Sequence, residues 1–328
     1  MKLSVVLAVY NAEDTISEQL EALARQTWDE PWELIVANNG SKDQTQAIVE
    51  SFSSKIANLK IIDASQRKGA SYARNKGVEV AQASMIAFCD ADDIVRDNWI
   101  AEIAAAIEQH GFVCGPMSIA ALNPGWRIQE PIGVRVGDEL FHASDLSDHY
   151  FPPFPKDGGY FRNGGTCNMG ILKSIHQDIG GFDEEFLRYQ DGDYCIRAQL
   201  KGYKLHFAPQ AIVEYRYRLS LRDTFSQFRD WGKWVMLIPR KYGPPTSLRK
   251  KISYVFGGWW SLPLEIIKVR SRAGLFALIT GFAIRLGQSQ GCIEFMVLPD
   301  IQDWFAAKFG NSGQAEGAVN QDPKARLD

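Results

Sequence analysis

Cysteine is scarce in this sequence, and its cysteines are not spaced as pairs. The 328 residues include five, each well separated from the next along the chain. Small disulfide-bonded domains and structural zinc sites both depend on regularly paired cysteines. The absence of such pairs predicts buried thiols in a reducing compartment. The five are Cys89, Cys114, Cys167, Cys195 and Cys292.

A strong net charge and a long hydrophobic run are also missing. The formal net charge of -3 gives no reason to expect a nucleic-acid partner. The apolar run Leu3–Val9 has no small-residue cleavage site after it, so it is typical of a first strand rather than of a signal peptide. No segment reaches the roughly 20 apolar residues that span a bilayer. We therefore expect a cytoplasmic protein that touches the inner face of a membrane only from its surface.

The first 118 residues contain a regular alternation of strand and helix patterns. Short apolar runs predict strands at 3–9, 33–37, 59–62, 85–89 and 112–118. Buried strands that alternate with amphipathic helices favour an α/β fold with a parallel sheet covered on both faces. Ligands bind such sheets at the carboxyl ends of the strands. The helical stripes are Ile16, Leu20, Leu23; Thr45, Ile48, Phe52; and Ile100, Ile103, Ile107.

The rest of the chain is less regular. Residues 119–165 are rich in Pro, Gly and aromatic residues and predict an irregular connection near the ligand-binding edge. Apolar periodicity returns at 169–179 and 194–200, and a strand is expected at 204–207. Beyond Leu219 the pattern is helical, and from Gly310 it is polar and typical of a disordered tail.

Three carboxylates, Asp90, Asp92 and Asp93, follow the fourth predicted strand directly. Carboxylates this close raise one another's pKa unless a cation neutralises them. Mg²⁺ or Mn²⁺ prefers such oxygens and can stabilise the negative charge on a departing diphosphate. The alternative is a solvated acidic turn that caps a helix starting near Asn98. The position at the ligand-binding edge favours the metal.

Four segments in register carry a resemblance to a known family. They are 4–13, 38–43, 69–77 and 90–93, and together they resemble family 2 of the nucleotide-diphospho-sugar glycosyltransferases. The resemblance implies a GT-A, Rossmann-like α/β fold: a mostly parallel central sheet flanked by helices, with a helical C-terminal extension. It also implies a catalytic domain over 1–218, with donor binding in 1–118 and acceptor binding in 119–218. We expect the extension at 219–309 and the tail at 310–328.

The resemblance also implies roles for individual residues. Tyr10 and Asn38 would line the pocket of the nucleotide base, and Asp90 would face the ribose or the metal. Asp92 would be the direct metal ligand. Arg74 would hold diphosphate oxygens with its planar fork, the alternative being a helix-surface arginine paired with an acid. The implied donor-binding positions are Val9, Tyr10, Asn11, Glu13, Asn38, Gly69, Arg74, Asp90, Ala91, Asp92 and Asn168.

A second acidic segment resembles the family's catalytic-base motif. Asp191 aligns with the base that takes the proton of the acceptor hydroxyl, and Gln190 replaces the usual flanking acid. Losing that like charge should lower the pKa of Asp191. We interpret Asp193 as the N-cap of a helix at 194–200 or as an acceptor contact. Two further departures are Asn38, where the family has an acid, and Tyr215, where it often has a metal-binding histidine.

The C-terminal third combines basic residues with tryptophans, including Trp231, Trp234, Trp259 and Trp260. Basic amphipathic helices with Trp are typical of contact with an anionic membrane surface. The alternative is a helical layer that packs on the catalytic domain. The sequence lacks both the Gln-x-x-Arg-Trp motif and the spanning helices of polymerising family members, which favours a single sugar transfer.

We therefore expect an inverting, metal-dependent glycosyltransferase. It would move a sugar from a UDP-, dTDP- or GDP-sugar to a lipid-linked or polysaccharide acceptor in cell-surface glycan synthesis. One alternative is a catalytically inactive GT-A scaffold that binds nucleotide or a partner, which the departures at Asn38, Gln190 and Tyr215 support. Another is a nucleotidyltransferase, but the sequence has no glycine-rich nucleotide loop after the first strand.

Overall fold

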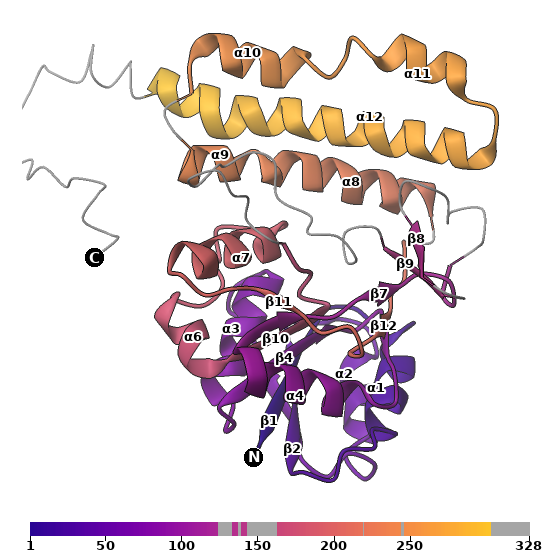
Figure 1. Ribbon diagram of the computed structural model, residues 1–328, viewed down its shortest axis with the longest axis vertical. Coiled ribbons are helices and arrows are strands. Elements are labelled where there is room, and N and C mark those ends of the chain that lie inside the picture. The colour runs from indigo at the N-terminus through magenta and orange to yellow at the C-terminus, as the bar shows by residue number, and fades with distance from the viewer. Residues whose placement is uncertain (124–132, 137–138, 143–162, 219, 244–245, 303–328) are drawn as a thin grey trace, which may run out of the picture.

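The computed structural model describes residues 1–123, 133–136, 139–142, 163–218, 220–243 and 246–302. These residues form an α/β part and a layer of helices stacked on one end of it (Figure 1). All five cysteines are buried and free, as the sequence predicts. The expected tail beyond Gly310 lies outside the described residues.

A seven-stranded sheet forms the centre of the α/β part, in the order β11-β6-β10-β4-β1-β2-β3. Strands β1 (Leu3–Val9), β2 (Trp32–Asn38), β3 (Leu59–Asp63) and β4 (Met85–Asp90) are parallel, and β10 (Asn168–Leu172) runs antiparallel to β4. Val9 pairs with Asn38 and Ala8 with Asp90, so the polar turns after β1, β2 and β4 share one edge of the sheet. This confirms the predicted fold class and the placement of these turns.

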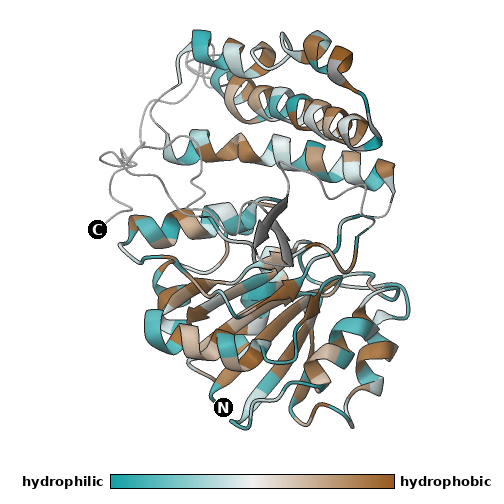
Figure 2. Ribbon diagram, turned by 45° about the vertical axis from the view of Figure 1, so that its right-hand side comes forward, coloured by the Kyte–Doolittle hydropathy of each residue, from teal (hydrophilic) through white to brown (hydrophobic). Residues whose placement is uncertain are grey.

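Helices cover both faces of this sheet, because each strand is apolar on both sides. The odd-numbered residues of β1 pack with α1 (Ile16–Ala24), α2 (Thr45–Ser51) and α4 (Trp99–His110). Val6 faces the other side, where α3 (Ala70–Val80), α6 (Lys173–Asp178) and α7 (Gln190–Leu200) supply the core. The three predicted helical stripes are therefore present. Figure 2 shows the hydrophobic strands between these helices.

Two strand predictions were wrong in detail, and the periodic segment 169–179 contains two elements. The run 112–118 breaks at Gly115 into β6 (Phe112–Cys114) and β7 (Met117–Ser118), which belong to different sheets. A Cβ at Gly115 would lie 2.1 Å from the Ala211 carbonyl oxygen, so the chain turns where only glycine fits. The segment 169–179 is strand β10 followed by helix α6. The strand expected at 204–207 is the shorter β11 (His206–Phe207).

A second, five-stranded sheet was not predicted. Its order is β5-β12-β7-β9-β8, and it places β12 (Val213–Glu214) between β5 (Ile94–Val95) and β7. Strands β8 (Gly133–Val136) and β9 (Glu139–His142) form a hairpin inside the connection that was expected to be irregular. Strand β5 begins just after Asp93. Because β12 pairs with β5, β12 and the residues that follow it lie beside the acidic cluster.

The helical extension expected beyond Leu219 is present. Helices α8 (Leu221–Val235) and α9 (Leu237–Tyr242) lie nearest the α/β part, and α12 (Arg272–Cys292), which continues into a π-helical turn η2 (Ile293–Val297), packs on α8. Helices α10 (Leu248–Phe256) and α11 (Leu262–Lys268) are outermost (Figure 1). Among the described residues, no helix is both long and apolar enough to cross a bilayer.

Candidate active site

The three carboxylates at the end of β4 form one compact cluster. Asp90, Asp92 and Asp93 each offer an oxygen, and these oxygens lie within 4.8 Å of one another. Asp90 and Asp92 are about one-third exposed, whereas Asp93 is buried. The backbone N–H of Arg216 donates to Oδ1 of Asp93 at 2.9 Å, and Oδ2 is buried without a partner among the described residues. The cluster therefore combines open carboxylate oxygens with an unsatisfied buried one.

The electrostatics of the cluster fit a divalent cation. Burial, followed by the charges of neighbouring carboxylates, raises the pKa of Asp92 and raises the pKa of Asp93 well above its ordinary value. A hard cation would offset both effects, because it replaces lost hydration and neutralises the like charges. Asp90, Asp92 and Asp93 would hold it. The helix cap proposed as an alternative is wrong: α4 begins at Trp99, its N-cap residue is Asn98, and no side chain makes a capping hydrogen bond.

Two arginines near the C-terminal end of the α/β part contact the acidic cluster, and the sequence analysis did not predict them. Nη1 of Arg218 lies 3.2 Å from Oδ2 of Asp92, and Nε of Arg216 donates to the Asp92 carbonyl oxygen at 3.0 Å. Both follow β12, and in the sequence they were grouped with the basic C-terminal third. Their position next to Tyr215 could have indicated this placement, because the resemblance puts a metal-binding histidine at residue 215.

Gln19 of α1 forms hydrogen bonds with the backbone of the same turn. Its side-chain amide donates to the Asp90 carbonyl oxygen and accepts from the backbone N–H of Val95, both at 3.0 Å. Gln19 is fully buried on α1, among the apolar residues of the predicted helical stripe. A buried polar side chain satisfied at both ends fixes its neighbours, so Gln19 holds the conformation of the acidic turn.

The turns after β1 and β2 are tied together by side chains expected in the donor site. Oδ1 of Asn11 accepts from the backbone N–H of Lys42 at 2.7 Å, and Oε2 of Glu13 accepts from that of Gln44 at 2.8 Å. Asn11 has a φ of 47°, in the left-handed region that asparagine tolerates. These contacts give Asn11 and Glu13 a positioning role: they hold the polar turns around the edge of the sheet.

Two of the residues expected at the base pocket differ in exposure. Tyr10 is 57% exposed directly after the buried Val9, so its ring is accessible for stacking. Asn38 is buried, and its Oδ1 already accepts from the backbone N–H of Ser41 at 2.9 Å. A carbonyl oxygen has a second lone pair, so Asn38 keeps one acceptor position.

Gly69 begins α3 and connects it to the second turn. Its φ of 131° favours glycine, and its N–H donates to Oδ1 of Asn39 at 2.9 Å. Asn39 also donates to the carbonyl oxygens of Ala64 and Arg67. Asn39 thus fixes the start of α3, the helix that carries Arg74.

Arg74 lies beneath the acidic cluster and is only 3% exposed. Its Nη2 lies 2.7 Å from Oδ1 of Asp90, and its guanidinium lies over the ring of Phe182. The helix-surface alternative is wrong because the side chain is buried, although the expected acidic partner is there. Nε and Nη1 are buried and have no partner among the described residues. Unsatisfied buried donors are costly, which points to an acceptor that is supplied by a ligand.

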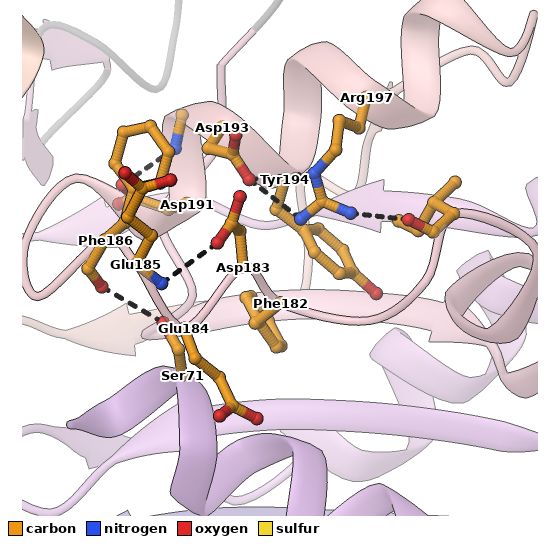
Figure 3. Close-up of polar contacts among 12 residues, drawn as sticks. Ser71, Phe182, Asp183, Glu184, Glu185, Phe186, Asp191, Asp193, Tyr194 and Arg197 are labelled. Atoms are coloured by element: carbon orange, nitrogen blue, oxygen red, sulfur yellow. Dashed lines mark hydrogen bonds and ion pairs between the residues drawn. The ribbon is translucent and has the colours of Figure 1, made fainter. Parts of the chain in front are cut away.

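Asp191 reaches the same region from a segment about 100 residues further along the chain. Residues 182–186 dock on α3: Asn75 exchanges two hydrogen bonds with the backbone of Phe182. Ser71 donates to the Phe186 carbonyl oxygen (Figure 3). Tyr189, with a φ of 67°, then turns the chain into α7. Asp191 stands in the first turn of this helix, within electrostatic reach of Arg74 and Asp90.

The expected direction of the Asp191 pKa shift was wrong. Burial raises the pKa of this carboxyl, and the opposing effects of the Gly192 N–H and of Arg74 do not outweigh it. The sequence argument considered the missing acid at Gln190 and not the low-polarity surroundings. A raised pKa makes a carboxylate a stronger proton acceptor.

The N-cap expected at Asp193 is also wrong, because α7 already begins at Gln190. Asp193 is fully buried and pairs with Arg197, whose Nε lies 2.8 Å from Oδ2 (Figure 3). It also accepts a short hydrogen bond from the hydroxyl of Tyr242 on α9. Asp193 therefore joins α7 to the helical layer.

Two further residues are Asn168, expected at the donor site, and Tyr215, which replaces the family's histidine. Asn168 is buried, accepts from Nε1 of Trp99 at 2.8 Å and donates to two backbone carbonyl oxygens. This geometry favours a structural role rather than contact with a donor sugar. Tyr215 lies near Asp92 and Asp93, whose charges, together with burial, raise its pKa well above the ordinary value. A neutral phenol stands where the resemblance places a histidine.

Two family models match the chain. Glycosyl transferase family 2 matches residues 4–154, and glycosyl transferase family group 2 matches residues 85–287. The glycosyltransferase AglE of Haloferax volcanii is 28% identical over 213 residues, 64% of this chain and 65% of that protein. The uncharacterized glycosyltransferase YwdF of Bacillus subtilis is 29% identical over 223 residues, 66% of this chain and 75% of that protein. The chain thus spans a little under two thirds of the length of AglE.

Solved structures share the fold at lower identity. A mannosyltransferase from Pyrobaculum calidifontis, in complex with GDP-Man and Mn²⁺, aligns with a TM-score of 0.52 and 13% identity, over 95% of this chain and 81% of that one. S. aureus TarS 1–349, in complex with UDP-GlcNAc, aligns with a TM-score of 0.50 and 18% identity, over 90% and 91%. With its GT-A fold and its matches to both family models, the chain belongs to the family 2 glycosyltransferases.

Proposed function

We propose that this protein is a divalent-cation-dependent, inverting glycosyltransferase with Asp191 as its catalytic base. The donor would be a UDP-, dTDP- or GDP-sugar, and the acceptor a glycan or a lipid-linked sugar. The observation that carries the proposal is the convergence of the acidic cluster, Arg74 and Asp191 at one edge of the sheet. Residues 1–118 would bind the donor, and residues 119–218 would bind the acceptor.

The donor side of the proposal depends on charge. Asp92, assisted by Asp90 and Asp93, would hold Mg²⁺ or Mn²⁺, which supplies positive charge to a departing diphosphate. The unpartnered Nε and Nη1 of Arg74 would find their acceptors in donor oxygens. The ring of Tyr10 would stack on the base. Two proteins of the same fold are described in complex with UDP-GlcNAc and with GDP-Man and Mn²⁺, which supports this class of donor.

The acceptor side needs a base opposite the leaving group. The acceptor oxygen forms a bond to the anomeric carbon as the bond from that carbon to the diphosphate oxygen breaks, and Asp191 takes the hydroxyl proton. Its raised pKa makes it a stronger proton acceptor than an ordinary carboxylate. A relative from Haloferax volcanii, 23% identical over 276 residues and named glucosyl-dolichyl phosphate glucuronosyltransferase, supports a lipid-linked acceptor.

The donor site can be tested by substituting Asp92→Asn and measuring nucleotide and nucleotide-sugar binding across UDP, dTDP and GDP compounds with and without Mn²⁺. The variant should lose the Mn²⁺-dependent part of the affinity, because it removes a charged ligand from a partly exposed position. Asp97→Asn is the matched control: Asp97 is exposed and pairs with Arg25 at 3.5 Å. Unchanged affinity of Asp92→Asn in Mn²⁺ would refute the metal assignment. Donor binding by the unsubstituted protein with no turnover on any acceptor would favour the inactive scaffold.

A further inference from the structure

A row of large apolar side chains lies exposed on the two outermost helices. They recur every three or four residues along α10, the turn that follows it and α11, and Trp260 lies in that turn. Within each helix this spacing keeps side chains on one side. Phe256 is 59% exposed and Trp260 is 84% exposed. Single exposed apolar residues are ordinary, whereas a continuous row of them marks a binding surface. This outer row consists of Leu248, Ile252, Phe256, Trp260, Leu264 and Ile267.

The outer row is not needed to pack these helices on the protein. Other residues of the same segment already make those contacts: Tyr254 and Val255 pack against Met236, Cys292 and Met296. Nε1 of Trp259 donates to Oγ of Ser289 on α12 at 3.1 Å. The outer row is therefore additional apolar surface.

Most of the charges around the outer row are positive; Asp300, one of the acidic residues nearby, is paired with Lys251 of α10. Residues 246–272 include six Lys or Arg and a single acidic residue, Glu265. Glu265 is paired with Arg285 of α12, at 2.9 Å between Oε2 and Nη1. Among the residues whose side chains are described, Arg249, Lys250, Arg270 and Arg272 are exposed beside the row. A second copy of this surface would bring like charges together, whereas an anionic bilayer offers the opposite charge and an apolar interior.

We propose that the outer row and its flanking basic residues bind the surface of an anionic lipid bilayer. The side chains of the row would insert among the lipids, and the basic side chains would contact the headgroups. Helices α10 and α11 lie on the far side of the helical layer from the sheet (Figures 1 and 2). The layer itself adjoins the site, since Arg218 just before α8 pairs with Asp92 and Tyr242 of α9 bonds to Asp193. Docking would place the active site on the membrane side of the molecule.

The test is sedimentation of the full chain with vesicles, without nucleotide, at low salt. Phosphatidylcholine vesicles with and without phosphatidylglycerol are the probes. The protein should partition strongly only with the anionic vesicles. Phe256→Ser with Trp260→Ser should weaken partitioning at least about tenfold, from the apolar area removed. Arg249→Gln with Lys250→Gln should weaken it about tenfold and flatten its salt dependence.

A matched control is Val80→Ser with Phe207→Ser, two apolar residues with exposures of 44% and 41% on the α/β part. This pair should leave partitioning unchanged. Equal sedimentation with neutral and anionic vesicles, or undiminished binding by both the outer-row variant and the basic-residue variant, would overturn the proposal. So would a dimer of the unsubstituted protein that dissociates in the Phe256 and Trp260 variant without any vesicle binding. Because no donor is present, these outcomes are separate from those that test sugar transfer.

Discussion

The substitution Gly287→Ala should loosen the helical layer, because α8 and α12 touch there through their backbones. A Cβ at position 287 would lie 1.9 Å from the Arg229 carbonyl oxygen, where contacts below 3.0 Å are essentially never found. The helices must therefore separate locally by about 1 Å, a distance at which dispersion contacts lose a quarter to a half of their energy. Overpacking of this kind costs about 1–3 kcal/mol. A Cβ at Gly232 or Gly291 would lie 2.2 Å from a carbonyl oxygen of the facing helix, so the helix backbones are also close at the neighbouring turns and cannot absorb the shift.

Gly281→Ala on the same helix is the matched control. Its Cβ would meet only the end of the Arg285 side chain at 3.3 Å, which can move. Replacing glycine in a helix interior then stabilises by about 0.5–1 kcal/mol. Urea denaturation and limited proteolysis within 220–302 should show Gly287→Ala destabilised and Gly281→Ala unchanged or more stable. Equal stability of the two variants would refute the close packing of α8 on α12.

Two further predictions concern buried groups. Asp193→Asn should lower the free energy of unfolding by about 3 kcal/mol, because it leaves Arg197 without its buried carboxylate. The control is Asp178→Asn, at an exposed position, which should leave urea denaturation nearly unchanged. Burial lowers the pKa of His176 from 6.5 to about 4, so protons bind the unfolded chain first as pH falls. The stability that depends on neutral His176 should be fully present above pH 6.5. The free energy of unfolding should fall by about 2 kcal/mol between pH 7.5 and 5, and His176→Gln should remove this loss. An identical pH dependence in that variant would contradict this assignment.

Much of the α/β part follows from local pattern. The apolar runs of β1, β2 and β4 are continuous because both faces of the sheet are covered, and this made them visible in the sequence. The acidic residues after β4 could be placed at the site because parallel strands end at a common edge. Pattern failed where one residue controls the backbone. Tyr189 in the left-handed region starts α7 earlier than its apolar periodicity suggests, which turns Asp193 from a cap into a buried partner of Arg197.

Long-range contacts account for the other differences. Arg216 and Arg218 lie beside the acidic cluster because β12 pairs with β5, and two-residue strands have no readable period. The raised pKa of Asp191 comes from the whole fold around α7 rather than from the adjacent Gln190. The segments 124–132 and 143–162 of the connection expected near the site lie outside the described residues.

The most direct test of the proposed mechanism is turnover and donor affinity of Asp191→Asn. The variant keeps the size and hydrogen bonding of the side chain but cannot take the acceptor proton, which is worth about 100- to 10,000-fold in rate. Donor affinity in Mn²⁺ should stay unchanged, because in the proposed mechanism Arg74 and the acidic cluster would hold the donor. A fall in turnover within that range, with unchanged donor affinity, is the result we predict. Retained turnover in Asp191→Asn would show that the base lies elsewhere, and its loss in Asp193→Asn alone would show that the two roles are exchanged.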